Sequence, residues 1–181
     1  MPERYFVAAL CVALGTACNS DSMSTENSST GLPPQGARAV EAWLATGAYE
    51  DWTCEPEVHE ARSPSPHGWN RICSNDAIAS HARDKDAWPL GAAAVKELYA
   101  SADAKQPKGY AVYVKTEADS ADGAHWYWYE RLTPDGDPVA DGMGDEGTAK
   151  TICVACHAAA GSDDAHTPSP GGRDQVYTPV H

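Results

Sequence analysis

Basic residues are scarce in this sequence, and so are long apolar runs. The 181 residues contain 13 Lys and Arg against 26 Asp and Glu, which gives a formal net charge of −13. Such a surface repels phosphate groups, so nucleic acid is excluded as an expected partner. A solvated acidic surface is the plain interpretation, and docking to a basic redox partner is the alternative. The length suits one domain with a hydrophobic core of its own.

The apolar run at the N-terminus, residues 5–14, is too short to span a bilayer, which takes about 20 residues. It follows Arg4 and precedes small residues, the pattern of a secretory signal peptide over residues 1–17. Cys18 comes next and resembles the lipid-modified cysteine of bacterial lipoproteins, although Gly15 stands where these usually have Leu. We therefore expect an exported, periplasmic protein that is anchored to the membrane through a lipid on Cys18.

Residues 18–36 have few apolar side chains and are rich in Ser, Asn, Thr and Pro, so they cannot bury a core. We interpret them as the lipid anchor and a flexible linker, and we place the folded domain at residues 37–181. Within that domain, Cys54 and Cys73 form an even pair once the two cysteines of the motif described below are set aside. A disulfide between them is the natural interpretation in an exported protein, and two free thiols or a metal pair are the alternatives.

The domain is predicted to be α+β, mainly an antiparallel β-sheet with short flanking helices. Apolar residues at helical spacing ahead of Gly47 predict a helix of about 10 residues. Ser74 or Asn75 can cap a second short helix, which Trp88 and the following proline end. The segment AAAVKELY is ambiguous between helix and strand.

Two segments in the middle of the chain predict strands. GYAVYVKT alternates between two faces, and HWYWYERL carries four successive aromatic residues, as expected for a strand covered on both faces. We expect two or three antiparallel strands here. A helix over TAKTICVACHAAA then completes the predicted order of elements.

The segment CVACH has two thiols three positions apart and a histidine directly after the second, which is the attachment spacing of c-type haem. Cys153 and Cys156 would lie on one face of a helix, where each thiol can form a thioether with a vinyl group of the porphyrin. His157 would then supply the axial imidazole to the iron. We expect one covalent haem c per chain on the C-terminal helix. A redox dithiol, a zinc site or a disulfide is the alternative.

No methionine follows this motif, and Met143 lies ahead of it in a glycine-rich loop. A methionine-ligated electron carrier is therefore disfavoured. The 13 Pro and 15 Gly, together with the predicted strands, also exclude the four long helices of the helical cytochromes c′.

Four segments in this order resemble the cytochrome P-460 family, which includes the β-type cytochromes c′: WPLGAAAVKELY, GYAVYVKT, HWYWYERLTPDG and CVACH. The resemblance runs from about residue 40 to the C-terminal end. It implies an antiparallel β domain, often a homodimer, with a five-coordinate haem that is open on its distal side. The P-460 proteins proper oxidise hydroxylamine, whereas the β-type cytochromes c′ bind gases such as nitric oxide.

The resemblance also implies roles outside the haem motif. Lys96 is the candidate for a lysine cross-linked to the porphyrin, and a surface lysine paired with Glu97 is the alternative. Arg71 resembles a distal-pocket arginine that hydrogen-bonds a bound ligand, and an exposed ion pair is its alternative. Glu146, with Asp145 beside it, is the candidate proton acceptor, and a solvated loop acid is the alternative. Weaker candidates for the cross-link are Lys85, Lys108 and Lys115.

These observations predict a monohaem c-type cytochrome with an open distal site and redox chemistry on small nitrogen compounds, either hydroxylamine or nitric oxide. Two alternatives stay open. One is a cytochrome that binds nitric oxide without turnover. The other is an electron-transfer cytochrome, in which a histidine such as His67 is the sixth ligand. The expected partners are a small nitrogen compound, a redox-partner cytochrome and a second copy of the chain.

Overall fold

The computed structural model describes Met1, residues 31–162 and residues 171–181. The predicted signal peptide and the predicted lipidation site Cys18 lie outside these residues. Within the described residues, none of the helices is both long enough and apolar enough to cross a membrane.

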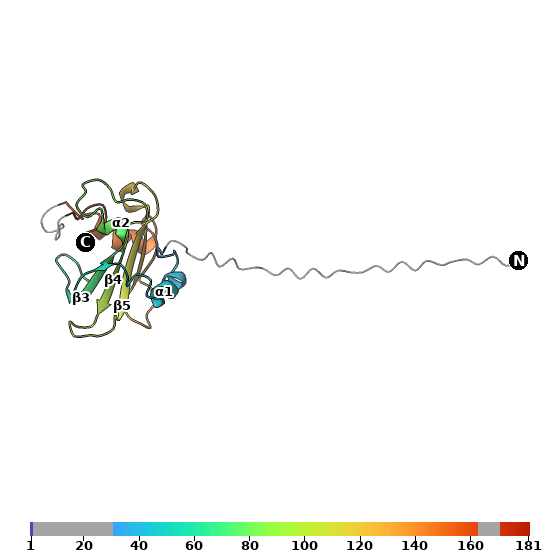
Figure 1. The fold of residues 1–181 in the computed structure, drawn as a ribbon, viewed down its shortest axis with the longest axis horizontal. Coiled ribbons are helices and arrows are strands. Elements are labelled where there is room, and N and C mark those ends of the chain that lie inside the picture. Colours follow the sequence, from blue (N-terminus) through green and yellow to red (C-terminus); the bar gives the residue numbers. More distant parts are fainter. Residues whose placement is uncertain (2–30, 163–170) are drawn as a thin grey trace.

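The domain is built on a seven-stranded antiparallel sheet, in the order β1-β3-β4-β5-β6-β7, with β2 paired to β3 (Figure 1). This confirms the prediction of a mainly antiparallel α+β fold, and the sheet has further strands on both sides of the middle segments, for which two or three strands were expected. The strands are β1 (Thr53–Cys54), β2 (His59–Glu60), β3 (Trp69–Ser74), β4 (Ala93–Tyr99), β5 (Gly109–Lys115), β6 (Trp126–Arg131) and β7 (Ala140–Met143).

The ambiguous segment AAAVKELY forms β4, a central strand between β3 and β5. Six of its seven residues are buried, because both faces of the strand are covered. This burial removes the alternation of apolar and polar residues that would have marked a strand in the sequence. The aromatic segment forms β6, and its first five residues are buried on both faces, as predicted.

Short helical segments flank the sheet: α1 (Ala37–Ala45), α2 (Asp76–Ala79), the 3₁₀ turn η1 (Ala121–Gly123), the π-helix η2 (Ala149–Val154) and α3 (Ala155–His157). The first helix agrees with the prediction and ends ahead of Gly47, whose φ of 70° is the left-handed value that glycine readily adopts. The segments η2 and α3 are continuous, and together they are called the motif helix below.

The second helix is shorter than predicted, a single turn over Asp76–Ala79. Asn75 caps it as expected, because its side-chain oxygen accepts the Ile78 N–H at 3.2 Å. The same oxygen also accepts the Ala93 N–H at 3.1 Å, which ties the cap to the start of β4. Residues 83–87 are all exposed, and a helix with no face to bury is marginal in water.

The sheet buries a hydrophobic cluster on each face. On one face Val95, Val112 and Tyr127 pack with Val40 and other residues of α1, which lies beside the sheet in Figure 1. On the other face, residues of β3, β4 and β6 pack with α2, the motif helix and residues 171–181. The second face is the one that carries the candidate site.

Contacts of the domain begin before residue 37. Leu32 packs against the cluster that α1 covers, and the Gly36 N–H donates to the Tyr127 hydroxyl at 2.9 Å. The next N–H, of Ala37, donates to the Asp141 carboxylate at 2.9 Å. The last residues of the predicted linker are therefore attached to the sheet.

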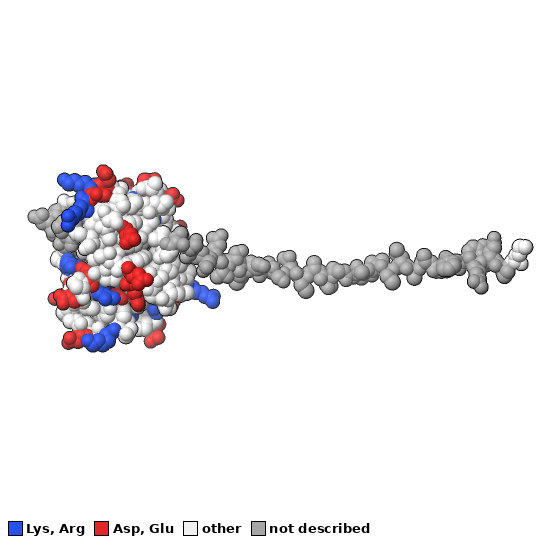
Figure 2. Space-filling model, in the orientation of Figure 1, with Lys and Arg blue, Asp and Glu red and all other residues white. Residues whose placement is uncertain are grey.

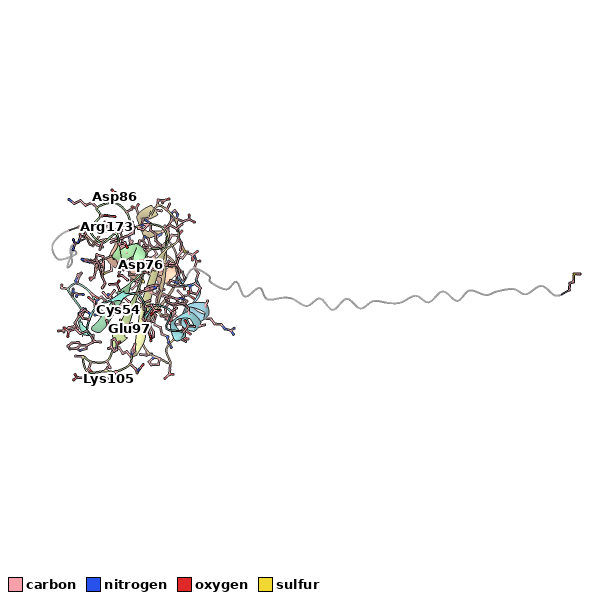
Figure 3. All side chains as sticks on the ribbon, in the orientation of Figure 1. Cys54, Asp76, Asp86, Glu97, Lys105 and Arg173 are labelled. Carbon is pink, nitrogen blue, oxygen red and sulfur yellow. A yellow bond between two sulfur atoms is a disulfide. The ribbon has the colours of Figure 1, made fainter. Side chains whose placement is uncertain are left out.

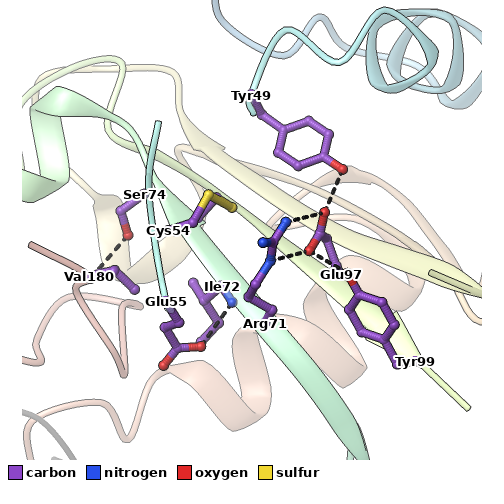
Figure 4. The surroundings of a disulfide bond; sticks show 10 residues. Tyr49, Cys54, Glu55, Arg71, Ile72, Ser74, Glu97, Tyr99 and Val180 are labelled. Carbon is purple, nitrogen blue, oxygen red and sulfur yellow. Dashed lines mark hydrogen bonds and ion pairs between the residues drawn. A yellow bond between two sulfur atoms is a disulfide. The ribbon is translucent and has the colours of Figure 1, made fainter. Parts of the chain in front are cut away.

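The predicted disulfide between Cys54 and Cys73 is confirmed (Figure 4). The two cysteines are directly opposed partners in the antiparallel pairing of β1 with β3. Cys73 is fully buried in the cluster beneath α1, so the bond attaches the short first strand to the core of the sheet.

Replacing both cysteines (Cys54→Ser/Cys73→Ser) should lower the free energy of unfolding by about 3 kcal/mol, because the bond closes a loop of about 20 residues in the unfolded chain. Urea denaturation of the oxidised protein and of the double variant measures the difference. Wild-type protein denatured under reducing conditions is the control and should match the variant. Equal midpoints for oxidised wild type and variant would contradict the prediction.

Candidate functional site

A cavity of about 510 Å³ opens over the second face of the sheet, within the size range of ligand pockets. Strands β3 to β6 form one wall, the loop of residues 62–68 forms a second, and the motif helix with residues 177–178 closes a third. The lining is largely apolar, with a small number of polar groups, and includes Ile72, Leu98, Tyr113, Trp128, Ile152 and Tyr177.

One row of paired residues crosses the sheet beneath the cavity. Ile72 pairs with Lys96, Lys96 with Ala111, and Ala111 with Glu130. Lys96 and Glu130 are therefore two strand spacings apart, about 10 Å between their backbones. Ala111 has the smallest side chain of the row, so it leaves room above the strand between the charged residues.

His67 links the two charged residues across that room. It lies on the loop between β2 and β3, and its Nδ1 is 3.1 Å from Lys96 Nζ. Its Nε2 is 3.1 Å from Glu130 Oε1. A protonated Lys96 donates to Nδ1, so the ring hydrogen is then on Nε2 and points to the carboxylate. The hydroxyl of Ser65, 2.9 Å from Nδ1, fixes the ring from the loop side.

Burial lowers the pKa of Lys96 to about 8, although the nearby carboxylates Glu130 and Glu55 oppose this shift. The amine is thus partly neutral in weakly alkaline solution, where an ordinary lysine is fully charged. A neutral amine is a nucleophile, and this makes Lys96 chemically distinct from a solvated surface lysine. The alternative of a surface lysine paired with Glu97 is not found, because these adjacent strand residues point to opposite faces.

The motif helix supplies three further groups to the cavity. Cys153 and Cys156 are free thiols, and both line the cavity together with His157. Burial raises the pKa of Cys153 to about 12, so its thiol is protonated. The first part of this helix is π-helical, a form that is rare in proteins and concentrated at functional sites.

His157 is held with one nitrogen available. Its Nδ1 is 2.5 Å from the carbonyl oxygen of Gln175, and a carbonyl can only accept, so the ring hydrogen lies on Nδ1. Burial lowers the pKa of His157 to about 3, the hydrogen bond to Gln175 opposes this shift, and the charge on Lys96 adds to it. The ring is therefore neutral, and Nε2 keeps the lone pair that binds a metal. Edge-on contact with Trp128, at 4.7 Å between ring centroids, fixes its plane.

These groups fit a covalently bound haem. Two thiols and an imidazole with a free lone pair border one apolar cavity, which is the donor set of c-type haem attachment. Among the described residues, no group of three or more His, Cys, Asp or Glu side chains is arranged to hold a metal ion, so nothing in this part of the chain favours the zinc alternative.

Comparison with known families gives an independent result. The family model for cytochrome P460 matches residues 46–178. The chain belongs to the cytochrome P460 family. No curated protein matches the chain significantly. Family membership indicates a haem-type cofactor, in agreement with the residues that border the cavity.

In this P460-family chain, Arg71 does not line the cavity, and Figure 4 shows it beside Glu97, Tyr49 and Tyr99 instead. Its guanidinium binds Glu97 on the opposite face of the sheet, through Nε at 2.6 Å and Nη2 at 3.1 Å. The hydroxyls of Tyr49 and Tyr99 donate to the same carboxylate at 2.8 Å each. Arg71 and Ile72 are consecutive strand residues and so face opposite ways, and Ile72 is the one that faces the cavity. The expected distal-pocket position of Arg71 is therefore not found.

Glu146 and its neighbour Asp145 are exposed between β7 and the motif helix, and neither lines the cavity. The carboxylate that does line it is Glu130, which sequence reasoning missed. The alternation within β6 could have identified it, because Trp126, Trp128 and Glu130 share one face of that strand.

The weaker lysine candidates occupy three different environments. Lys85 is exposed in a turn after α2. Lys108 is exposed at the rim of the cavity. Lys115 is fully buried, and its ammonium group contacts Asp174 and the carbonyl of Trp88. Of the four lysines named from the sequence, Lys96 is the one inside the cavity.

Lys96 should become reactive toward acylating reagents with a midpoint near pH 8, because burial disfavours its charged form. The neutral fraction rises as pH increases through the pKa, so labelling should be about half-maximal at pH 8. Peptide mass spectrometry across a pH series measures this, with a free lysine peptide, whose pKa is about 10.4, as the control. A midpoint near that of the free peptide would contradict the prediction. A Lys96 peptide found joined to a haem peptide would instead reveal the cross-link directly.

Proposed function

We propose that this protein is a monohaem c-type cytochrome whose open distal site performs redox chemistry on small nitrogen compounds of the hydroxylamine and nitric oxide type. One observation carries the proposal. The cavity has a haem-attachment set, Cys153, Cys156 and His157, on the motif helix, and a chain of polar groups on the sheet and the loop.

When bound, the haem would supply an iron centre that binds a small ligand and exchanges electrons with it. Cys153 and Cys156 would hold it through thioethers, and His157 would bind the iron through Nε2. Tyr113 and Trp128 form an apolar wall beside the imidazole. Their ring centroids lie 6.0 and 4.7 Å from the ring centroid of His157. With the haem in place, a largely apolar lining would keep the local dielectric constant low and so strengthen electrostatic interactions within the cavity.

Glu130 is proposed as the proton acceptor. Oxidation of hydroxylamine releases protons, and a carboxylate on the cavity wall can take one from a bound substrate. The His67 Nε2–H holds Glu130 Oε1, so Oε2 is the proposed acceptor atom. His67 also joins Glu130 to Lys96, and the three groups form a continuous hydrogen-bonded chain along which a proton can move.

The engagement of His67 favours the open site over the electron-carrier alternative. Both ring nitrogens already contact other groups, Nδ1 with Lys96 and Ser65, and Nε2 with Glu130. A histidine that ligated iron from this loop would have to give up one of these sets of contacts. This supports a five-coordinate iron.

Export, lipidation at Cys18 and a periplasmic location remain part of the proposal, on the basis of the N-terminal sequence. A redox-partner protein and a second copy of the chain are the proposed macromolecular partners. In Figure 2 the acidic and basic side chains of the face in view are interspersed rather than gathered into one patch. The formal net charge of −13 would favour a basic partner.

Wild-type protein produced with haem-attachment machinery should carry one haem that survives acid extraction, because thioethers are covalent. The variant Cys153→Ser/Cys156→Ser should lose it on the same treatment. Intact mass measures both. The ferric wild type should give optical and electron paramagnetic resonance spectra of a five-coordinate, high-spin iron. A six-coordinate, low-spin spectrum would contradict the open site and favour the electron carrier.

Glu130→Gln should lower the rate of hydroxylamine oxidation by about 10²–10⁴-fold, the usual contribution of a general base. Steady-state turnover with an artificial electron acceptor measures it. Glu146→Gln is the matched control and should retain wild-type turnover, because that side chain is exposed away from the cavity. Equal losses in both variants would contradict the role of Glu130. A wild type without turnover that binds nitric oxide tightly would favour the gas-binding alternative.

A further inference from the structure

The carbonyl that holds His157 belongs to a turn with an unusual backbone. Arg173 and Val176 exchange two backbone hydrogen bonds, of 2.9 and 2.8 Å, and enclose Asp174 and Gln175. Both enclosed residues have a positive φ, 38° for Asp174 and 72° for Gln175, which residues other than glycine rarely adopt. Such a conformation persists only where surrounding contacts impose it.

A buried ion pair imposes it from the sheet side. Lys115, at the end of β5, has no exposed side-chain surface, and its Nζ is 3.2 Å from Asp174 Oδ2. The same Nζ donates to the carbonyl of Trp88 at 2.9 Å, and it lies 5.8 Å from the centre of the Trp126 ring. A buried ammonium needs a carboxylate partner, so the pair fixes Asp174 relative to the sheet.

A second set of contacts fixes the turn from the outer side. The guanidinium of Arg173 stacks on the Trp88 ring at 3.5 Å, and the indole N–H of Trp88 donates to the Arg173 carbonyl at 3.0 Å. Arg173 also donates to the carbonyls of Gly171, His81 and Asp86. Figure 3 shows Arg173 and Asp86 at the same end of the domain. The turn is thus held on both sides.

We propose that Lys115 and Asp174 are positioning residues for the proximal ligand: through the turn they fix the Gln175 carbonyl on His157 Nδ1 and thereby set the reduction potential of the bound haem. This inference rests on the proposed function, because it requires His157 to bind the iron. Neither residue lines the cavity or touches the reacting atoms.

The physical link is the strength of one hydrogen bond. A carbonyl held against Nδ1–H draws the hydrogen away from the ring and makes Nε2 a stronger donor to the iron. A stronger donor stabilises the ferric state and lowers the potential. A turn free to relax toward ordinary backbone angles would move the carbonyl away and weaken this effect.

The test uses the holoprotein and the double variant Lys115→Met/Asp174→Asn. Removing both charges leaves no buried charge unpaired, and asparagine tolerates positive φ. The reduction potential should shift to more positive values, and the iron–histidine band in the resonance Raman spectrum of the ferrous protein should shift to lower frequency. If the double variant does not fold, Lys115→Met alone, which leaves only the partly exposed Asp174 carboxylate without its partner, should give shifts in the same directions.

Lys105→Met/Asp103→Asn is the matched control, because it removes one charge of each sign from exposed positions, at the end of the domain opposite Arg173 in Figure 3. It should leave both the potential and the band at their wild-type values. Cys54→Ser/Cys73→Ser is the control for general loosening, since the disulfide lies on the opposite face of the sheet.

Three outcomes would overturn the inference. The first is a folded double variant with unchanged potential and band. The second is an equal shift in the disulfide variant, which would reveal a general structural effect. In both cases the wild type carries haem, so the proposed function survives. The third is a wild type without covalent haem, which overturns the proposed function and this inference together.

Discussion

Strands β3 to β6 pair in a register that brings Ile72, Lys96, Ala111 and Glu130 into one row across the sheet. Because side chains alternate along a strand, a slip of one residue would turn every member of a strand to the other face. Lys96 would then exchange places with Glu97. The aromatic residues buried on both faces of β6 resist such a slip, so the packing of the core also fixes the chemistry of the cavity.

The two faces of the sheet use buried carboxylates in opposite ways. Glu97 is bound by Arg71 and by two tyrosine hydroxyls, so both of its carboxylate oxygens are occupied. Its role is structural, because it links β3, β4 and the segment that follows α1. Burial and this carboxylate together raise the pKa of Tyr49 and Tyr99, which keeps them hydrogen-bond donors. Glu130 instead lies at the end of a chain that begins at Lys96 and faces a cavity. A carboxylate in that setting is suited to proton transfer.

The parts of this picture that the sequence predicted are those that depend on local spacing. The CVACH segment and the alternation within the strands can be recognised from a few residues. The disulfide follows because Cys54 and Cys73 are the two cysteines that remain to be paired. The positions of Arg71 and Glu130 depend on which face of the sheet each side chain occupies, and the position of Glu146 depends on the course of a loop. Distance along the chain therefore gave the wrong position for Arg71 and Glu146 and did not reveal Glu130. The second helix was predicted too long, because its length depends on which of its residues can pack against the rest of the domain.

The described residues include four cysteines with two different chemical requirements. One pair forms a disulfide, and under the proposed function the other must stay as thiols until it reacts with a porphyrin. Four cysteines allow three complete pairings, and two of these would join the motif cysteines to Cys54 and Cys73. Cys73 lies in the cluster on one face of the sheet and Cys153 in the cluster on the other. Once β3 and β4 have paired, the sheet acts as a partition that protects the thiols of the motif from the wrong disulfide.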